Sequence, residues 1–212
     1  MIITYHGVEF FKVQFGDITI AFNPISKESK FKTTRFFADI ALISLESPDM
    51  NGIENLAYNG KEPFVISGPG EYEIKNVFLK GFASKSMYEG KERINTIYSV
   101  KLESMNLCFL GALSDINLST EVKEELGDVD VLFLPIGAEG VLDAAKAEKL
   151  SVEIEPKIII PMHYGEVGIK DALKKYLKEA GEEDVKPVDK LTLKKKDLEG
   201  KEGETVVLSY EI

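Results

Sequence analysis

The stretch ADIALISLESPDMNG, Ala38–Gly52, decides the fold that we expect for this chain. Its first half contains an apolar strand, Ile40–Ser44, and its second half is a polar loop that offers a helical or turn segment over Asn51–Leu56. Proteins of the α/β class commonly place their chemistry in the loop that follows such a strand. This loop contains neither histidine nor cysteine, so the fold is easier to predict than the activity.

Working outward, the hydrophobic pattern predicts strands on both sides of this stretch. They are Glu9–Phe15 and Asp17–Phe22 before it, and Pro63–Ser67, Tyr72–Ile74, Val77–Ala83, Ile94–Leu102 and Leu107–Leu110 after it. After Gly111, apolar strands at Val129–Leu134 and Lys157–Met162 alternate with helices that begin at Ser119 or Thr120, at Asp143 and at Ile169. Strands at Leu191–Lys195 and Thr205–Ile212 follow. No linker interrupts the pattern, which predicts one domain over residues 1–212 with two sheets flanked by helices.

Composition excludes several classes of partner. The 212 residues carry a formal net charge of −10, which argues against a nucleic acid or an anionic membrane as the main partner. The N-terminal residues lack a basic, cleavable signal, and no apolar run reaches membrane-spanning length, so we expect a soluble, cytoplasmic protein. Cys108 is the only cysteine, and its apolar strand predicts a small buried side chain rather than a nucleophile.

Four short motifs follow one another along the chain. They are YHGVE at Tyr5–Glu9, Asn23-Pro24, LPIG at Leu134–Gly137, and IIIPMHYG at Ile158–Gly165. This series resembles the metallo-β-lactamase superfamily, in particular its short, single-domain bacterial hydrolase-like members, which have Gly-His-Ser/Ala, Asp-Pro, Pro-Ile-Gly and a final histidine strand at these places. The resemblance implies an α/β fold, an αββα four-layer sandwich of two mixed, mostly antiparallel sheets flanked by helices.

The central motif departs from that family. Its members carry Thr-His-x-His-x-Asp-His after the key strand and bind two metal ions, usually zinc. The three histidine positions here hold Leu45, Ser47 and Met50, and only Asp49 matches. A catalytic zinc needs about three protein ligands, and neither a leucine nor a methionine side chain replaces an imidazole there.

The other ligand positions of the family also differ. The early Gly-His position is Val8, and Gly111-Ala112 stands where the family's metal-bridging aspartate follows a glycine. No histidine lies between His6 and His163, and His6 aligns with no family ligand. By resemblance, Asp49 and His163 both belong to the second metal position, so they are the weak candidates for metal binding or catalysis.

We expect a pocket near these two residues. Its predicted members are Glu46, Ser47, Asp49, Glu71, Asp115 and His163, with the three additional carboxylates as groups that could supplement a metal site. Each has an alternative interpretation: the loop carboxylates could be solvated, Asp49 could cap the helix after it, and His163 could be a hydrogen-bonded structural residue. A serine hydrolase built on Ser47 or Ser114 with His163 is disfavoured, because no Gly-x-Ser-x-Gly occurs.

The sequence therefore predicts a metallo-β-lactamase-like protein that has lost most of its dinuclear metal site. We expect it to be non-catalytic or to bind a ligand or partner of unknown specificity, either a small molecule or a protein, and a homo-oligomer stays open. The alternative is a metal-dependent hydrolase with a residual mononuclear site at Asp49 and His163. No cofactor is expected for the first interpretation, and zinc or manganese would serve the second.

Overall fold

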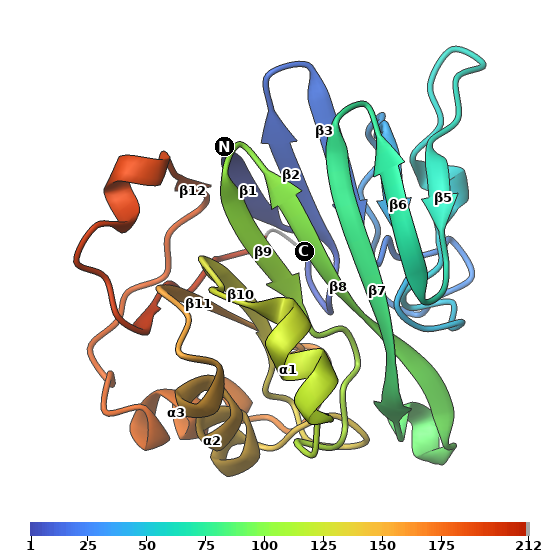
Figure 1. Cartoon of the computed structure of the whole chain (residues 1–212). Helices are drawn as coiled ribbons and strands as arrows, with labels where there is room; N and C mark the ends of the chain where they lie inside the picture. Colours follow the sequence, from blue (N-terminus) through green and yellow to red (C-terminus); the bar gives the residue numbers. More distant parts are fainter. Residues whose placement is uncertain (211–212) are drawn as a thin grey trace.

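The computed structural model describes residues 1–210 and contains two mixed β-sheets that face each other (Figure 1). The first sheet has the order β12-β1-β2-β3-β4-β5 and is antiparallel except at β3-β4-β5. Its strands are β1 (Ile2–Tyr5), β2 (Phe11–Phe15), β3 (Ile18–Phe22), β4 (Ile40–Leu42), β5 (Phe64–Ile66) and β12 (Leu191–Thr192). The key strand predicted from the sequence is β4, and it lies next to the edge of this sheet.

The second sheet has the order β13-β11-β10-β9-β8-β7-β6. Its strands are β6 (Gly70–Ile74), β7 (Val77–Ser86), β8 (Arg93–Leu102), β9 (Met105–Phe109), β10 (Val131–Pro135), β11 (Ile158–Met162) and β13 (Glu204–Thr205). The hairpin-connected strands β6 to β9 are antiparallel, whereas β9, β10, β11 and β13 run parallel. All five residues of β10 and of β11 are buried, as the continuous apolar runs predict for strands covered on both faces.

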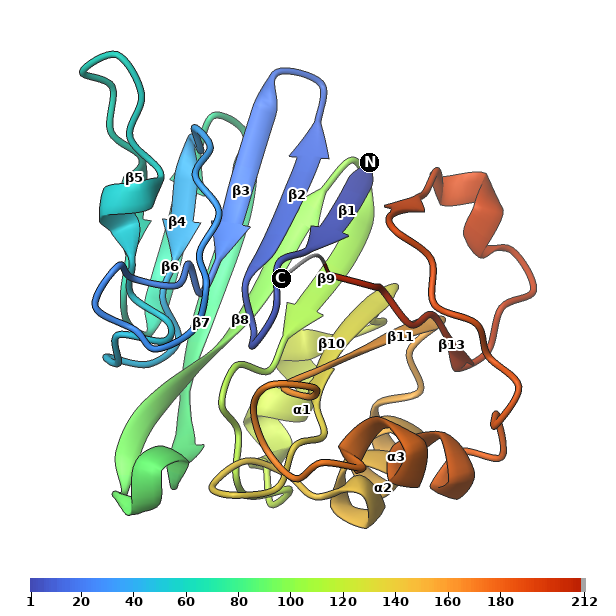
Figure 2. The ribbon, with the colours of Figure 1, turned by 180° about the vertical axis from the view of Figure 1, so that it is seen from behind.

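Three helices lie on the side of the second sheet that faces away from the first (Figures 1 and 2). They are α1 (Thr120–Leu126), α2 (Ala144–Ile154) and α3 (Ala172–Glu179). The hydroxyl of Ser119 accepts a hydrogen bond from the Val122 N–H, and Asp143 accepts one from the Lys146 N–H, so both predicted helix starts are capped by side chains. Two sheets with flanking helices confirm the predicted α/β sandwich.

Two apolar clusters hold these layers together. The larger one fills the space between the sheets, where the rings of Phe22, Phe109 and Phe133 pack with centroids 4.8 to 5.8 Å apart. The smaller one includes Phe10, Ala21, Ala41, Leu45 and Met50, which face the other side of the first sheet. There, loop segments and the 3₁₀ turn Ile53–Asn55 cover the sheet, in the place where the sequence predicted a helical or turn segment.

The C-terminal part differs most from the prediction. The strand expected over Leu191–Lys195 is only β12, because the chain turns into a 3₁₀ helix at Lys195–Leu198. The strand expected over Thr205–Ile212 is only β13, and its last two positions lie outside the described residues. Cys108 is buried as predicted, and burial raises the pKa of its thiol to about 12. Within residues 1–210, no helix is long and apolar enough to cross a membrane.

Candidate functional site

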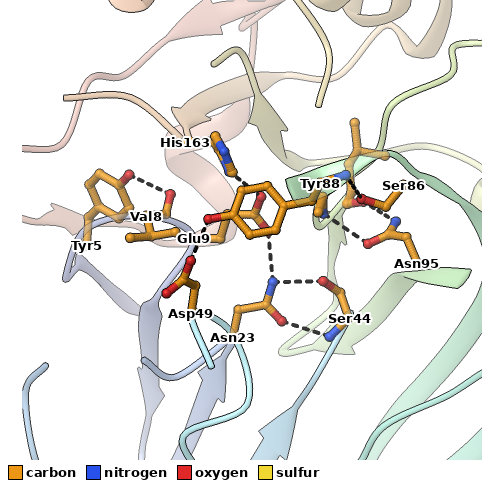
Figure 3. Close-up of polar contacts among 12 residues, drawn as sticks. Tyr5, Val8, Glu9, Asn23, Ser44, Asp49, Ser86, Tyr88, Asn95 and His163 are labelled. Carbon is orange, nitrogen blue, oxygen red and sulfur yellow. Dashed lines mark hydrogen bonds and ion pairs between the residues drawn. The ribbon is translucent and has the colours of Figure 1, made fainter. Parts of the chain in front are cut away.

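A buried polar network lies where the ends of several strands meet (Figure 3). Its centre is the pair Glu9 and His163, both 0% exposed, with Glu9 Oε1 2.7 Å from His163 Nδ1. Glu9 precedes β2 and His163 follows β11, so the pair joins the two sheets. The His163 N–H also donates to the Val8 carbonyl at 2.7 Å, which fixes the backbone beside the pair.

Asn23 extends this network to the end of β4. Its amide nitrogen donates to Glu9 Oε2 and lies within hydrogen-bond distance of Ser44 Oγ, both at 2.8 Å, and its carbonyl oxygen accepts from the Ser44 N–H at 2.7 Å. Asn23 occupies the Asp-Pro position of the family motif. Because Glu9 needs a donor, an aspartate at this position would place a second buried carboxylate against the first. The neutral Asn23 side chain therefore supplies the amide donor that the Glu9 carboxylate needs. We call Glu9, Asn23, Ser44 and His163 the cleft network.

Asp49 has a separate pair of partners. Tyr88 Oη donates to Asp49 Oδ2 at 2.6 Å, and Ser29 Oγ donates to Asp49 Oδ1 at 2.5 Å. Burial, together with the hydrogen bond to the Asp49 carboxylate, raises the pKa of Tyr88 well above its usual range, so the phenol remains a donor. The Tyr88 ring also packs edge-on against His163, with centroids 5.2 Å apart. Gly52 precedes the 3₁₀ turn without a side-chain cap, so the capping interpretation of Asp49 was wrong.

The residues at the family's other ligand positions belong to the apolar core. Leu45 is 2% exposed, and Met50 and Ala112 are 0% exposed. The backbone is closely packed here, because a Cβ added to Gly111 would lie 2.4 Å from Ser44 Oγ. None of these three side chains offers zinc an imidazole or a carboxylate, and the thioether of Met50 does not replace one.

These donors do not fit a dinuclear zinc centre. In the part of the chain that the structure describes, no three His, Cys, Asp or Glu side chains form a group that could hold a metal ion. Both oxygens of Asp49 already accept hydrogen bonds, and Nδ1 of His163 is held by Glu9. Of these two residues, the atom still available to bind a metal ion is His163 Nε2, which is buried without a hydrogen-bond partner.

A cleft of about 470 Å³ lies over these groups, and Asp49, Tyr88 and His163 line it. Its other polar lining is mostly charged and comprises Glu28, Ser29, Lys30, Glu89, Glu139 and Glu166. Gly137 packs behind the imidazole, since a Cβ there would lie 2.1 Å from the His163 carbonyl oxygen and 2.6 Å from its ring. The Leu134–Gly137 motif therefore fixes the position of His163 rather than contributing a reacting group.

The structure brings together only two of the six residues predicted for the pocket, Asp49 and His163. Glu71 does not belong to it: this residue is on β6, pairs with Lys80 at 3.1 Å and lines a different groove. Glu71 was predicted from a glycine-rich turn, which forms the start of an exposed strand instead.

The other three predicted residues are engaged elsewhere. Glu46 is exposed and accepts a hydrogen bond from Asn51, and Asp115 is bonded to Asn117. Ser47 is 1% exposed and does not line the cleft. Ser114 donates to a backbone carbonyl, so neither serine of the serine-hydrolase alternative is hydrogen-bonded to His163.

Sequence reasoning missed Glu9, Asn23, Ser44 and Tyr88 as members of the site. Two of them had a signal: Asn23 stands in place of the family's aspartate, and Glu9 follows Val8 at the Gly-His motif. Compared with the family motifs, this chain gains an acid at Glu9 and loses one at Asn23. The two changes together indicate that the acidic and neutral positions have been exchanged. Tyr88 had no such signal, because it comes from a hairpin tip that is distant in sequence from the other members.

Comparisons with known proteins identify the family of this chain. A family model described as "Beta-lactamase superfamily domain" matches residues 2–163. A UPF0173 metal-dependent hydrolase from Pyrococcus horikoshii is 36% identical over 104 residues, 45% of this chain and 44% of that protein. Its counterpart from Pyrococcus furiosus is 34% identical over 117 residues, 50% of this chain and 48% of that protein. The chain thus spans about half the length of the curated relatives it matches.

Solved structures extend the similarity over the whole chain. A proposed zinc-dependent hydrolase of the metallo-β-lactamase superfamily from Thermotoga maritima is 26% identical, with a TM-score of 0.79 and 99% of each chain covered. A metallo hydrolase from Ignicoccus hospitalis is 18% identical, with a TM-score of 0.64 over 91% of this chain and 99% of that one, and shares the fold alone.

Proposed function

The chain belongs to the β-lactamase superfamily domain family, and on that premise we propose that it is a non-catalytic, ligand-binding protein that has lost most of its dinuclear metal site. Its cleft over Asp49, Tyr88 and His163 binds a small polar molecule without a metal ion. The scaffold and the concave site are retained, while the chemistry of the site differs from the family's.

One observation carries this proposal: the two remaining candidate ligands are hydrogen-bonded to protein partners. Asp49 accepts from Tyr88 and Ser29, and His163 is paired with Glu9. A zinc ion on His163 Nε2 and Asp49 would have to replace the hydrogen bonds of Asp49 and would still lack a third protein ligand. Without a metal ion, the family's route to a hydroxide nucleophile at neutral pH is closed.

His163 Nε2 supports the choice of ligand. When Nδ1–H donates to Glu9, the neutral ring presents Nε2 as a hydrogen-bond acceptor. This nitrogen has no partner among the described residues, and its side chain lines the cleft. The site therefore suits a ligand that donates a hydrogen bond, such as a hydroxyl or an amide.

The same nitrogen favours a second candidate function. An unpartnered Nε2 in a cleft that is also lined by Asp49 could hold one weakly bound metal ion, with Asp49 as the other ligand, in a mononuclear metal-dependent hydrolase. The Pyrococcus relatives are named metal-dependent hydrolases, which agrees with this alternative.

Metal content separates the two functions. We expect protein purified without added metal or chelator to contain far less than one zinc or manganese per chain, and micromolar metal to give no saturable uptake. The variants Asp49→Ala and His163→Ala should behave like the parent chain, as should Asp115→Ala, which removes a carboxylate outside the cleft.

The opposite result has a clear signature. Near-stoichiometric metal that is lost in Asp49→Ala and His163→Ala, but kept in Asp115→Ala, would reject the metal-independent proposal in favour of the hydrolase. Nitrogen-15 NMR of labelled histidine provides a second measurement, because an unprotonated Nε2 in the parent chain is required for the proposed acceptor.

A further inference from the structure

The cleft over Asp49, Tyr88 and His163 has more acidic than basic lining. It contains one lysine, Lys30, and five carboxylates, those of Glu28, Asp49, Glu89, Glu139 and Glu166. Glu89 forms an ion pair with Arg93 at 2.7 Å, and within residues 1–210 the other four form none. This charge disfavours an anionic ligand. It does not identify a ligand by itself, because exposed carboxylates are normally solvated.

Asp49 differs from the exposed carboxylates of the cleft because it is buried. It is 6% exposed, and its hydrogen-bond donors, Ser29 and Tyr88, are neutral hydroxyls. A buried carboxylate is normally paired with a cation, but within residues 1–210 Asp49 forms no ion pair. Each carboxylate oxygen can accept two hydrogen bonds, so each Asp49 oxygen retains a position for another donor. Asp49 therefore indicates a cationic partner that the described residues do not supply.

His163 provides an independent observation that points to a ligand. Its side chain is 0% exposed and lines the same cleft, and its Nε2 is buried without a hydrogen-bond partner. Tyr88 contacts both residues, because its ring packs against the imidazole with centroids 5.2 Å apart and its hydroxyl donates to Asp49 (Figure 3). The two acceptors therefore lie within the span of one tyrosine side chain.

Together, the two acceptors select the head group of the ligand. A cation without N–H groups would neutralise the charge of Asp49 but would leave His163 Nε2 without a donor. A neutral hydroxyl or amide would satisfy Nε2 but would leave Asp49 without an opposite charge. A protonated amine does both, because each of its N–H groups is a charged hydrogen-bond donor.

We propose that the ligand of the cleft is a protonated primary amine, which donates hydrogen bonds to Asp49 and to His163 Nε2. This inference rests on the proposed function and narrows its ligand from hydrogen-bond donors in general to cationic ones. The carbon chain of the amine packs on Pro48 and Val167, which also line the cleft. A metal ion is the competing cation, but the described residues contain no group of three His, Cys, Asp or Glu side chains that could hold one.

Nitrogen-15 NMR of histidine-labelled protein tests the contact directly. The chain has two histidines, of which His163 lines the cleft and His6 does not. Titration with butylamine at about pH 7, where a primary amine is protonated, should shift the Nε2 resonance of His163 and leave that of His6 unchanged.

Two matched probes separate charge from hydrogen-bond donation. Butyltrimethylammonium has the same charge as butylamine without an N–H group, and 1-butanol has a hydrogen-bond donor without the charge. We expect each to bind more weakly than butylamine by about tenfold or more, because each satisfies only one of the two acceptors.

Substitutions of the full chain test the acidic partner. Asp49→Asn should weaken butylamine binding by about tenfold or more, since it removes the buried charge and keeps an oxygen that accepts from Tyr88. Glu166→Gln, at an exposed position of the cleft, should weaken binding by about two- to fivefold. Glu183→Gln makes the same charge change at an exposed residue outside the cleft and should leave the affinity unchanged. Circular dichroism of each variant establishes that the fold is intact.

Three results would overturn the proposal, and they differ in what they mean for the proposed function. If 1-butanol binds as tightly as butylamine, the amine is wrong and the metal-independent cleft stands. Equal weakening by Asp49→Asn and Glu183→Gln would show a general attraction of cations to a chain of net charge −10. If the His163 resonance does not respond to butylamine, the amine is wrong as well, and a response to zinc in its place would reject the proposed function too.

Discussion

The cleft network and the polar side chains Tyr176, Glu182 and Thr205 near α3 and β13 both contain buried polar atoms, but they differ in how many of those atoms have a hydrogen-bond partner. In the cleft network, Asn23 bonds both Glu9 and Ser44, and Glu9 bonds His163. Among its side chains within residues 1–210, His163 Nε2 alone is buried without a partner. In the second set, each of the three residues has one buried oxygen without a partner in good hydrogen-bond geometry among the described residues. Polar residues at the place of a family's usual site can thus bond mainly to one another. Four predictions test this contrast, from the largest expected effect to the smallest.

Removing Glu9 should have the largest effect. We expect Glu9→Ala to lower the free energy of unfolding by about 3–5 kcal/mol, because His163 Nδ1 loses its partner and the Asn23 amide loses one acceptor in a water-excluded site. Denaturant unfolding followed by circular dichroism measures the change. Glu9→Gln retains one acceptor and should lose less. A cost below about 1 kcal/mol for Glu9→Ala would contradict a structural role for the network.

The hydrogen bond between Tyr88 and Asp49 should contribute less to the free energy of unfolding than Glu9 does. Tyr88→Phe removes the 2.6 Å hydrogen bond to the carboxylate, and we expect a loss of about 1–3 kcal/mol in the free energy of unfolding. Tyr58→Phe is the matched control, since Tyr58 is 64% exposed and should change stability by less than about 0.5 kcal/mol. Equal effects of the two substitutions would show that Asp49 does not depend on this donor.

A second buried nitrogen without a hydrogen-bond partner, Nε2 of His6, should make the stability depend on pH. Burial, aided by the charge of Lys12, lowers the pKa of His6 from 6.5 to about 4. Between these values the unfolded chain binds the proton and the folded chain does not, so stability should fall as the pH decreases from about 6.5 to about 4. The expected loss is about 1–2 kcal/mol, reduced by the partial exposure of this side chain.

His6→Phe isolates this contribution from the carboxylates that titrate in the same range. A phenyl ring preserves the packing against Phe10 and Phe36, with centroids now 5.1 and 5.5 Å from the imidazole. Unfolding curves at pH 7 and pH 4.5 should differ less for His6→Phe than for the parent chain. Identical pH dependence in the two chains would remove His6 from the explanation.

Thr205→Val should have the smallest effect. Its Oγ1 has no partner, so replacing the hydroxyl by a methyl group should change the free energy of unfolding by less than about 0.5 kcal/mol or increase it slightly. Thr33→Val is the contrasting substitution, because Thr33 Oγ1 donates to the Ile25 carbonyl at 2.6 Å, and it should cost about 1 kcal/mol. A larger cost for Thr205→Val would indicate that this hydroxyl has a hydrogen-bond partner within the protein.

The fold was predictable because its signals are local. Alternating and continuous apolar runs located the central strands within a few residues, and side-chain caps marked the starts of α1 and α2. The short strands β12 and β13 were overestimated, because each pairs for only two residues before the chain turns away. The local hydrophobic pattern of a sequence does not indicate at which residue such a strand pairing ends.

The candidate site was predictable only in part. The family motif located Asp49 and His163, and the apolar residues at the other ligand positions proved to be buried. Their partners were not predictable, because Tyr88 reaches Asp49 from 39 positions away and Glu9 reaches His163 from 154 positions away. Such contacts depend on how the sheets pack, and a one-residue shift in strand register would remove them.

The backbone bond between His163 and Val8 has a consequence for how the protein forms in the cell. During synthesis, residues 8 and 9 leave the ribosome long before residue 163, with which both make buried bonds. The Glu9 carboxylate must stay hydrated until residue 163 has been synthesised. Until then, the first sheet cannot pack against the end of β11 in the second sheet. Because contacts so distant in sequence form late, the cleft should close only after most of the chain has been translated.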